Sequence, residues 1–113
     1  AATLAAAKLH IPVAHVEAGP RMHDLTMPEE VNRITVDHLS KLRFAPDKPS
    51  IEHLKREGIT EGVYLTGDVM LDTFRLCEKR AMEQSEFLKD ERLKQGFVFM
   101  TLHRPANVDS KEC

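Results

Sequence analysis

The sequence predicts an α/β protein built on a parallel, Rossmann-like sheet with flanking helices. Two observations lead to this prediction. Short apolar runs alternate with longer helix-forming stretches along the 113 residues, and glycine or proline stands between most of them. Strands that alternate with helices pair in parallel through right-handed crossovers. The strands are expected at residues 11–16, 42–45, 63–66 and 97–101.

The first element is expected to be a helix over residues 1–9, because AATLAAAKL consists mainly of strong helix formers. No capping residue precedes it, so it reads as the end of a helix that begins elsewhere. The apolar run at residues 11–16 contains β-branched residues and is typical of a buried strand. A loop then extends to Met27, with Gly19 and Pro20 as a breaker pair.

The second helix is expected to begin at Pro28, whose fixed φ suits the first helical position. Glu29 and Glu30 follow in the first turn, where the helix dipole favours negative charge. Side chains at three- and four-residue spacing then predict the inner face of this helix. Those side chains belong to Val31, Ile34, His38 and Leu42.

The second strand, at residues 42–45, is followed by Pro46, which cannot continue it. Ser50 is expected to cap the next helix, which covers residues 51–57. Gly58 is expected to end that helix, because glycine readily adopts the left-handed conformation found there.

The last third of the chain differs in composition. Residues 69–95 are helix-forming and rich in charge, and a break is expected near Ser85. The charged part of this stretch is the best candidate for a domain boundary. The strand at residues 97–101 then leads into His103 and Arg104.

Composition argues against several classes of partner. The 16 Lys and Arg residues against 18 Asp and Glu residues give a net charge of -2, which offers no attraction to nucleic acids or anionic membranes. No apolar run approaches the roughly 20 residues that span a bilayer. The two cysteines form no CxxC motif. We therefore expect a cytoplasmic protein without a nucleic-acid or membrane partner.

Polar residues stand where the predicted strands end. The four strands are followed in turn by Glu17, Asp47, Asp68 and His103. In open parallel sheets, ligands bind beyond the carboxyl ends of the strands. The loop after the first strand is the longest of these connections, and it leads to Glu29. The sequence therefore predicts a functional site at this edge of the sheet.

Two interpretations are open for the glutamates at this edge. A carboxylate directly after an apolar strand, as at Glu17, suits acid–base chemistry when it is partly desolvated. Loop amides or Arg21 could equally satisfy Glu17. Glu29 stands four residues before Arg33, so these two could form an ordinary helical ion pair.

His103 and Arg104 place adjacent cationic donors after the fourth strand. Such a pair suits a diphosphate, because arginine makes two-pronged contacts with phosphate oxygens, although His-Arg pairs are also common on surfaces. The histidines show no metal-ligand spacing, and the glycines never form G-x-G-x-x-G. We therefore expect no metal site and no nicotinamide cofactor.

Four motifs follow one another along the chain. They are His15-Val16-Glu17-Ala18-Gly19-x-Arg21, Pro28-Glu29-Glu30-x-Asn32-Arg33, Thr66-Gly67-Asp68-Val69-x-x-Asp72 and Thr101-Leu102-His103-Arg104. In order and spacing they resemble the non-hydrolysing UDP-N-acetylglucosamine 2-epimerases over nearly the whole chain. The chain departs from the family pattern at Pro20, where an apolar residue is usual, and at Ala106, where a glutamate is usual.

The resemblance implies interconversion of UDP-GlcNAc and UDP-ManNAc without a cofactor. Members of the family expel UDP to form 2-acetamidoglucal, then add UDP back with a proton delivered to the other face of C2. This route needs carboxylates near C2 and cationic groups at the departing diphosphate. By the resemblance, the catalytic residues are Glu17, Glu29 and His103, and the substrate-binding residues are Arg21, Arg33, Arg104 and Asn107.

The resemblance also implies a two-domain fold of the GT-B type and a homodimer for the full-length protein. Residues 1–75 are then the later part of an N-terminal Rossmann-like domain, residues 76–95 a helical interdomain segment, and residues 96–113 the first strand and loop of a C-terminal nucleotide-binding domain. We therefore expect this chain to be inactive by itself. Two alternatives stay open: a hydrolysing 2-epimerase that releases ManNAc and UDP, and a non-catalytic interaction module that keeps the scaffold.

Overall fold

The computed structural model describes residues 1–102 and 108, so residues 103–107 and 109–113 lie outside the described residues. The chain divides into two compact units, Ala1–Leu76 and Cys77–Cys113, which we name the sheet unit and the C-terminal unit. The domain bounds expected at residues 75 and 95 stay a prediction.

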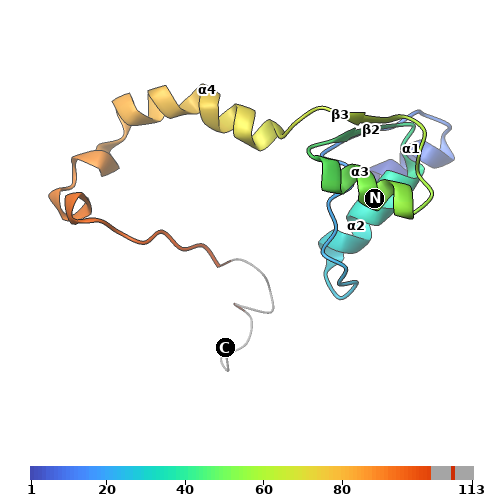
Figure 1. Cartoon of the computed structure of the whole chain (residues 1–113), viewed down its shortest axis with the longest axis horizontal. Helices are drawn as coiled ribbons and strands as arrows, with labels where there is room; N and C mark the ends of the chain where they lie inside the picture. The colour runs from blue at the N-terminus through green and yellow to red at the C-terminus, as the bar shows by residue number, and fades with distance from the viewer. Residues whose placement is uncertain (103–107, 109–113) are drawn as a thin grey trace. The chain divides into compact units, whose positions relative to one another are not determined.

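The sheet unit confirms the predicted parallel α/β fold. Its strands are β1 (Ala14–Val16), β2 (Leu42–Ala45) and β3 (Val63–Leu65), which lie in the order β1-β2-β3 with parallel pairing throughout. β2 and β3 lie side by side in Figure 1. The register places His15 beside Arg43. β1 is shorter than the predicted run because only the last three residues of that run pair with β2.

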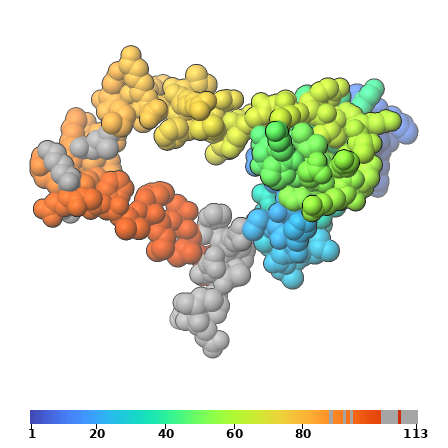
Figure 2. Space-filling model, viewed as in Figure 1, coloured from blue at the N-terminus to red at the C-terminus, as the bar shows by residue number. Residues whose placement is uncertain are grey.

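Three helices belong wholly to the sheet unit: α1 (Ala2–Lys8), α2 (Pro28–Leu39) and α3 (Lys48–Arg56). As predicted, α2 begins at a proline and carries two glutamates in its first turn. α1 contacts α2, whereas α3 contacts β2 and β3. In the space-filling view these elements form one packed body, coloured from blue to yellow-green (Figure 2).

The start of α3 differs from the prediction. The side chain of Asp47, not that of Ser50, caps the helix by accepting a 2.8 Å hydrogen bond from the Ser50 backbone N–H. The helix begins earlier, at Lys48, because a first turn tolerates the proline at position 49. Gly58 ends the helix with a φ of +80°, as predicted.

The buried face of α2 is not the predicted one. Val31 and His38 are exposed, Ile34 is only half-buried, and Leu42 lies beyond the helix, in β2. Glu30 and Asp37 are instead completely buried. The reason is that this face of the helix packs against the loop after β1, which presents backbone N–H groups and a guanidinium that need acceptors. An apolar face would leave those donors buried without partners.

Among the described residues, the completely buried apolar side chains are those of Ala18, Ala45 and Leu54. Charged and polar side chains are buried more often: Arg21, Glu30, Asp37, Ser40, Arg43 and Ser50. Because buried charges require partners, hydrogen bonds and ion pairs fix the loop after β1 more than apolar packing does.

α4 (Val69–Gln84) begins in the sheet unit and ends in the C-terminal unit. Two 3₁₀ helices follow at Glu86–Lys89 and Glu91–Gln95, so the break predicted near Ser85 is confirmed. No helix of the described residues has the length and apolar character that a membrane span requires.

The strand predicted at residues 97–101 is absent, and this prediction is wrong. These residues are exposed, and no strand in the described part of the chain pairs with them. A strand exists only through hydrogen bonds to a neighbouring strand, so an apolar run without such a neighbour stays irregular.

Candidate functional site

The carboxyl ends of the three strands meet at a cavity of about 330 Å³, which we name the strand-end cavity. Its lining residues are Glu17, Pro20, Pro46, Asp47, Asp68 and Met70. Glu17 follows β1, Asp47 follows β2 and Asp68 follows β3. The structure therefore brings three of the predicted strand-end residues together at the edge where parallel sheets bind ligands.

Glu17 has a rare backbone conformation. Its φ is +67°, in the left-handed region that residues with a Cβ seldom adopt. This conformation costs roughly 1–2 kcal/mol and persists only where surrounding contacts fix it. The side chain is exposed, and within the described residues it has no hydrogen-bond or ion-pair partner. The Glu17 carboxylate is therefore free to contact a ligand in the strand-end cavity.

The other two carboxylates of the strand-end cavity are used by the fold. Hydrogen bonds from the side chain and backbone of Ser50 lower the pKa of Asp47. Asp68 Oδ1 accepts a 2.7 Å hydrogen bond from the Met70 backbone N–H at the start of α4. Both aspartates therefore act as helix caps, which leaves Glu17 as the uncommitted carboxylate among the three.

Arg21 lies in a buried cluster of charges and does not contact Glu17. Its Nε and Nη2 donate to the two oxygens of Glu57 at 2.7 and 2.8 Å, and its Nη1 lies 2.8 Å from Asp37 Oδ2. The hydrogen bond to Glu57, together with Asp37, raises the pKa of Arg21 despite its burial. The alternative in which Arg21 satisfies Glu17 is wrong. Because the Arg21 side chain is only 1% exposed, its contacts give it a structural role. Substrate binding by Arg21 stays a prediction.

Asp37 is the centre of this cluster. Its Oδ1 lies 2.6 Å from His15 Nδ1, and its Oδ2 accepts a 3.1 Å hydrogen bond from the Gly19 backbone N–H. Burial alone would raise the pKa of Asp37, but the hydrogen bonds from His15 and Arg21 outweigh burial and lower it. Asp37 is therefore ionised at neutral pH, and its partners are His15 on β1 and Gly19 and Arg21 in the loop that follows.

The two glutamates at the start of α2, Glu29 and Glu30, have different environments in the structure, which the sequence did not predict. Glu29 is exposed, without a hydrogen-bond or ion-pair partner in the described residues, and it does not line the strand-end cavity. Glu30 is buried, and its Oε1 accepts 2.9 Å hydrogen bonds from the backbone N–H groups of Met22 and His23. Arg33 Nη1 lies 3.9 Å from Glu30 Oε2, so the ion pair predicted between Glu29 and Arg33 is wrong.

Acid is expected to destabilise the sheet unit through Asp37 and Glu57. A hydrogen bond from Arg21 lowers the pKa of Glu57, and the pKa of Asp37 is also lowered. The folded chain therefore binds these protons more weakly than the unfolded chain, whose Asp and Glu side chains have ordinary pKa values of 3.8 and 4.5. The stabilisation is fully present above about pH 5 and is lost as the pH falls further.

Urea unfolding of the chain between pH 6 and pH 2, followed by circular dichroism, measures this effect. We expect the urea midpoint to fall in the acid part of this range. Glu57→Gln is expected to lower the midpoint at pH 6 and to flatten its pH dependence, because one of the two titrating groups is gone. A midpoint that does not change with pH contradicts the prediction.

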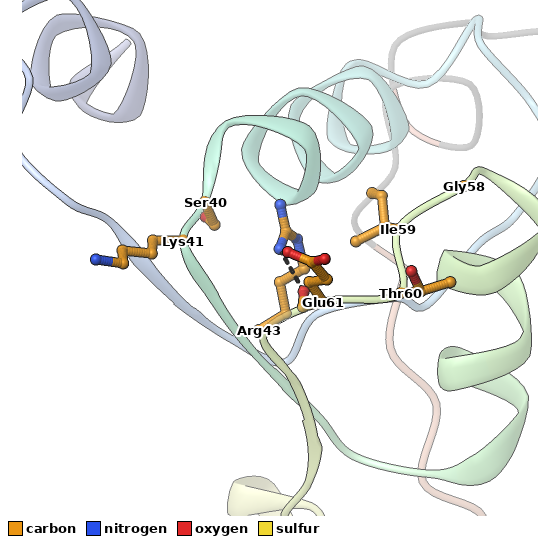
Figure 3. Close-up of a pocket in the computed structure, with 7 residues that line it drawn as sticks. All are labelled: Ser40, Lys41, Arg43, Gly58, Ile59, Thr60 and Glu61. Atoms are coloured by element: carbon orange, nitrogen blue, oxygen red, sulfur yellow. Dashed lines mark hydrogen bonds between the residues drawn. The ribbon is translucent and has the colours of Figure 1, made fainter.

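A larger cavity, of about 480 Å³, lies at the other edge of the sheet (Figure 3). It is lined by Ser40, Lys41, Arg43, Gly58, Ile59, Thr60 and Glu61, which lie just before or near the amino ends of β2 and β3. The Arg43 guanidinium there donates hydrogen bonds to the backbone carbonyls of Asp37 and Glu61. Because its buried cation already stabilises the fold, we assign the functional site to the strand-end cavity.

The predicted residues His103, Arg104 and Asn107 lie outside the described residues. Among the described residues, no group of three or more His, Cys, Asp or Glu side chains has the geometry to hold a metal ion. The chemistry that the described part of the site offers is therefore that of an uncommitted carboxylate next to two helix N-termini.

The fold and the site place this chain in a broad class: α/β proteins with a Rossmann-like parallel sheet and a polar site at the carboxyl ends of its strands. Comparison with known proteins narrows the class to a family. Residues 1–113 match the family described as UDP-N-acetylglucosamine 2-epimerase, and the chain belongs to this family.

The relatives agree with this assignment. The chain is 41% identical over 116 residues to the UDP-N-acetylglucosamine 2-epimerase homolog of Methanococcus maripaludis, covering 99% of this chain and 32% of that protein. It is 40% identical over 112 residues to the UDP-2,3-diacetamido-2,3-dideoxy-D-glucuronate 2-epimerase of Pseudomonas aeruginosa, covering 96% of this chain and 30% of that protein.

Solved structures show the same relationship. The crystal structure of Methanocaldococcus jannaschii UDP-GlcNAc 2-epimerase in complex with UDP-GlcNAc and UDP matches with a TM-score of 0.81 and 42% identity. The match covers 97% of this chain and 31% of that one. These epimerases have the GT-B fold, so the predicted fold class is confirmed. The chain spans about a third of the length of the relatives it matches.

Proposed function

We propose that this chain supplies acid–base residues of an enzyme that interconverts UDP-GlcNAc and UDP-ManNAc by elimination and re-addition of UDP. The observation that carries the proposal is the Glu17 carboxylate, which has no protein partner among the described residues and lines the strand-end cavity. Membership of the epimerase family supplies the reaction class.

The proposed reaction gives two carboxylates distinct tasks. In the elimination, one carboxylate removes the proton from C2 while the C1–O bond to UDP breaks, and the C–H electron pair becomes the double bond of 2-acetamidoglucal. In the re-addition, a proton reaches the opposite face of C2 and a diphosphate oxygen bonds to C1 again. We assign these tasks to Glu17 and Glu29, because both are exposed and uncommitted within the described residues.

The departing diphosphate needs positive charge, which stabilises the negative charge that develops on the leaving oxygen. We assign His103 to this task, and Arg33, Arg104 and Asn107 to substrate binding, on the motifs that carry them. Two observations support the assignment of Arg33: its side chain is 35% exposed, and among the described residues its one charged contact is the 3.9 Å approach to Glu30. We further propose that the full-length protein is a cytoplasmic homodimer and that this chain alone does not turn over substrate.

Overall identity supports a second sugar substrate about as well as it supports UDP-GlcNAc. The relative whose printed substrate is a diacetamido-dideoxy-glucuronate is 40% identical to this chain, and the UDP-GlcNAc 2-epimerase homolog is 41% identical. Overall identity therefore does not distinguish a neutral from an acidic sugar. The names of both relatives place the epimerisation at C2 of the sugar.

Incubating a full-length protein that contains this chain with UDP-GlcNAc in D₂O tests the proposal. We expect UDP-ManNAc that carries deuterium at C2, because the proton taken from C2 exchanges with solvent. Free ManNAc with UDP supports the hydrolysing alternative, and turnover of the glucuronate alone supports the acidic sugar. No turnover of either sugar, with intact folding, supports a non-catalytic module.

A further inference from the structure

The carboxylate of Asp37 contacts residues on both sides of Glu17 in the sequence. Asp37 Oδ1 contacts the His15 side chain, two residues before Glu17, at 2.6 Å. Asp37 Oδ2 accepts the Gly19 backbone N–H, two residues after Glu17, at 3.1 Å. The same Oδ2 lies 2.8 Å from Nη1 of Arg21, four residues after Glu17. The left-handed residue is thus enclosed by three contacts to one completely buried side chain on α2.

Further contacts stiffen the same segment. The Ala18 backbone N–H donates a 3.0 Å hydrogen bond to the Phe44 carbonyl on β2, and the Gly19 carbonyl lies 3.0 Å from His53 Nδ1 on α3. None of these contacts involves the Glu17 side chain. They fix its backbone and leave its carboxylate uncommitted, which is the arrangement that a preorganised catalytic group requires.

We propose that Asp37 is a positioning residue, which holds Glu17 in its left-handed backbone through His15 and the Gly19 N–H and thereby directs the Glu17 carboxylate to the strand-end cavity. The inference rests on the proposed acid–base role of Glu17. Asp37 itself is completely buried and does not line the strand-end cavity, so it acts through Glu17 and not on substrate.

His15 offers a matched pair of variants. Asp37 is ionised and can only accept, so His15 Nδ1 carries the hydrogen and donates it. His15→Asn keeps an N–H donor near the Nδ1 position, whereas His15→Leu removes it. Asp37→Asn replaces one acceptor oxygen by an amide donor. Glu52→Gln, on the exposed surface of α3, is the control for loss of a carboxylate elsewhere.

The first measurement does not depend on activity. In the 113-residue chain, the strong NOE between the amide and α protons of one residue reports a left-handed backbone at Glu17. We expect this signal in the parent chain, His15→Asn and Glu52→Gln, and its loss or weakening in His15→Leu and Asp37→Asn. A left-handed Glu17 in both disrupted variants overturns the proposal, whatever the protein catalyses.

The second measurement is kinetic, on the full-length protein with UDP-GlcNAc. His15→Leu is expected to lower kcat by about 10- to 100-fold with little change in KM, and His15→Asn is expected to restore most of it. In a Glu17→Gln background, His15→Leu is expected to lower kcat by less than about twofold, because both changes act on the same group.

These outcomes separate positioning from simple stabilisation. A structural residue would lower the melting temperature and reduce kcat by the same factor in the parent and in the Glu17→Gln background, and that result would overturn the proposal. If Asp37→Asn does not fold, the comparison of His15→Leu with His15→Asn still tests the proposal. His15→Leu removes one contact to Asp37 and leaves the Asp37–Arg21 ion pair in place. If the full-length protein shows no epimerase activity, the proposed function fails. The NOE still tests whether Asp37 holds Glu17 in its left-handed backbone conformation.

Discussion

Glu17→Gln is expected to lower the kcat of the full-length protein for UDP-GlcNAc by about 10²- to 10⁴-fold, with little change in KM. An amide cannot take or give the C2 proton at neutral pH, yet it has nearly the shape of the carboxylate. Glutamine also meets the same backbone restriction at a φ of +67°, so the fold is expected to survive. Glu29→Gln is expected to have an effect in the same direction.

Chromatography of the UDP-sugars at several substrate concentrations measures the change in kcat and KM, and circular dichroism checks folding. Glu52→Gln is the matched control, because it removes an exposed carboxylate outside the strand-end cavity. Near-normal turnover by both Glu17→Gln and Glu29→Gln would falsify the acid–base assignment.

Gly19→Ala is expected to destabilise the chain by about 2–5 kcal/mol, the sum of two effects. Gly19 has a φ of +93°, a conformation that costs a residue with a Cβ roughly 1–2 kcal/mol. A Cβ built at Gly19 would also collide with the backbone carbonyl of Ser50 in α3. Overpacking of this kind costs typically about 1–3 kcal/mol, because the loop and the helix must separate.

Gly67→Ala is the control that isolates the collision. Gly67 has nearly the same φ, +89°, but a Cβ there would meet no atom within 4 Å. We therefore expect Gly67→Ala to cost only the roughly 1–2 kcal/mol of backbone strain. Urea unfolding of both variants measures the difference, and equal losses of stability would show that the close approach of Gly19 to α3 does not matter.

The sequence predicted elements well where the signal is local. Pro28 with two following glutamates predicted the start of α2, and Gly58 predicted the end of α3. The strand at residues 97–101 failed because its formation depends on a partner strand, which a local apolar pattern does not report.

The pattern of apolar residues predicted the wrong buried face of α2, for a different reason. Val31 and His38 fit an amphipathic helix by spacing, but the helix turns Glu30 and Asp37 inward. These two carboxylates are seven residues apart, close to two full turns, so they share one face. That spacing was the available signal. The spacing alone did not predict burial, because acidic side chains are rarely buried unless hydrogen-bond donors surround them. Here the loop after β1 supplies those donors.

The site was predicted in outline and not in detail. The strand-end rule located Glu17, Asp47 and Asp68 at one edge, and the structure places all three around the strand-end cavity. The rule could not tell that both aspartates cap helices while the Glu17 side chain has no partner in the described part of the chain. Nor could it show that Arg21 is buried between Asp37 and Glu57.

The sequence by itself determined the parallel α/β class, the edge of the sheet that carries the site, and the family, because each follows from residue order and spacing. Only the tertiary structure decided which acidic side chains are free and which are committed. Glu17, Glu30 and Asp37 carry the same charge in the sequence, yet one is exposed without a described partner and two are buried among donors. The role of a carboxylate depends on the donors within hydrogen-bond distance, and for Asp37 the loop after β1 supplies them from about 20 residues away along the chain.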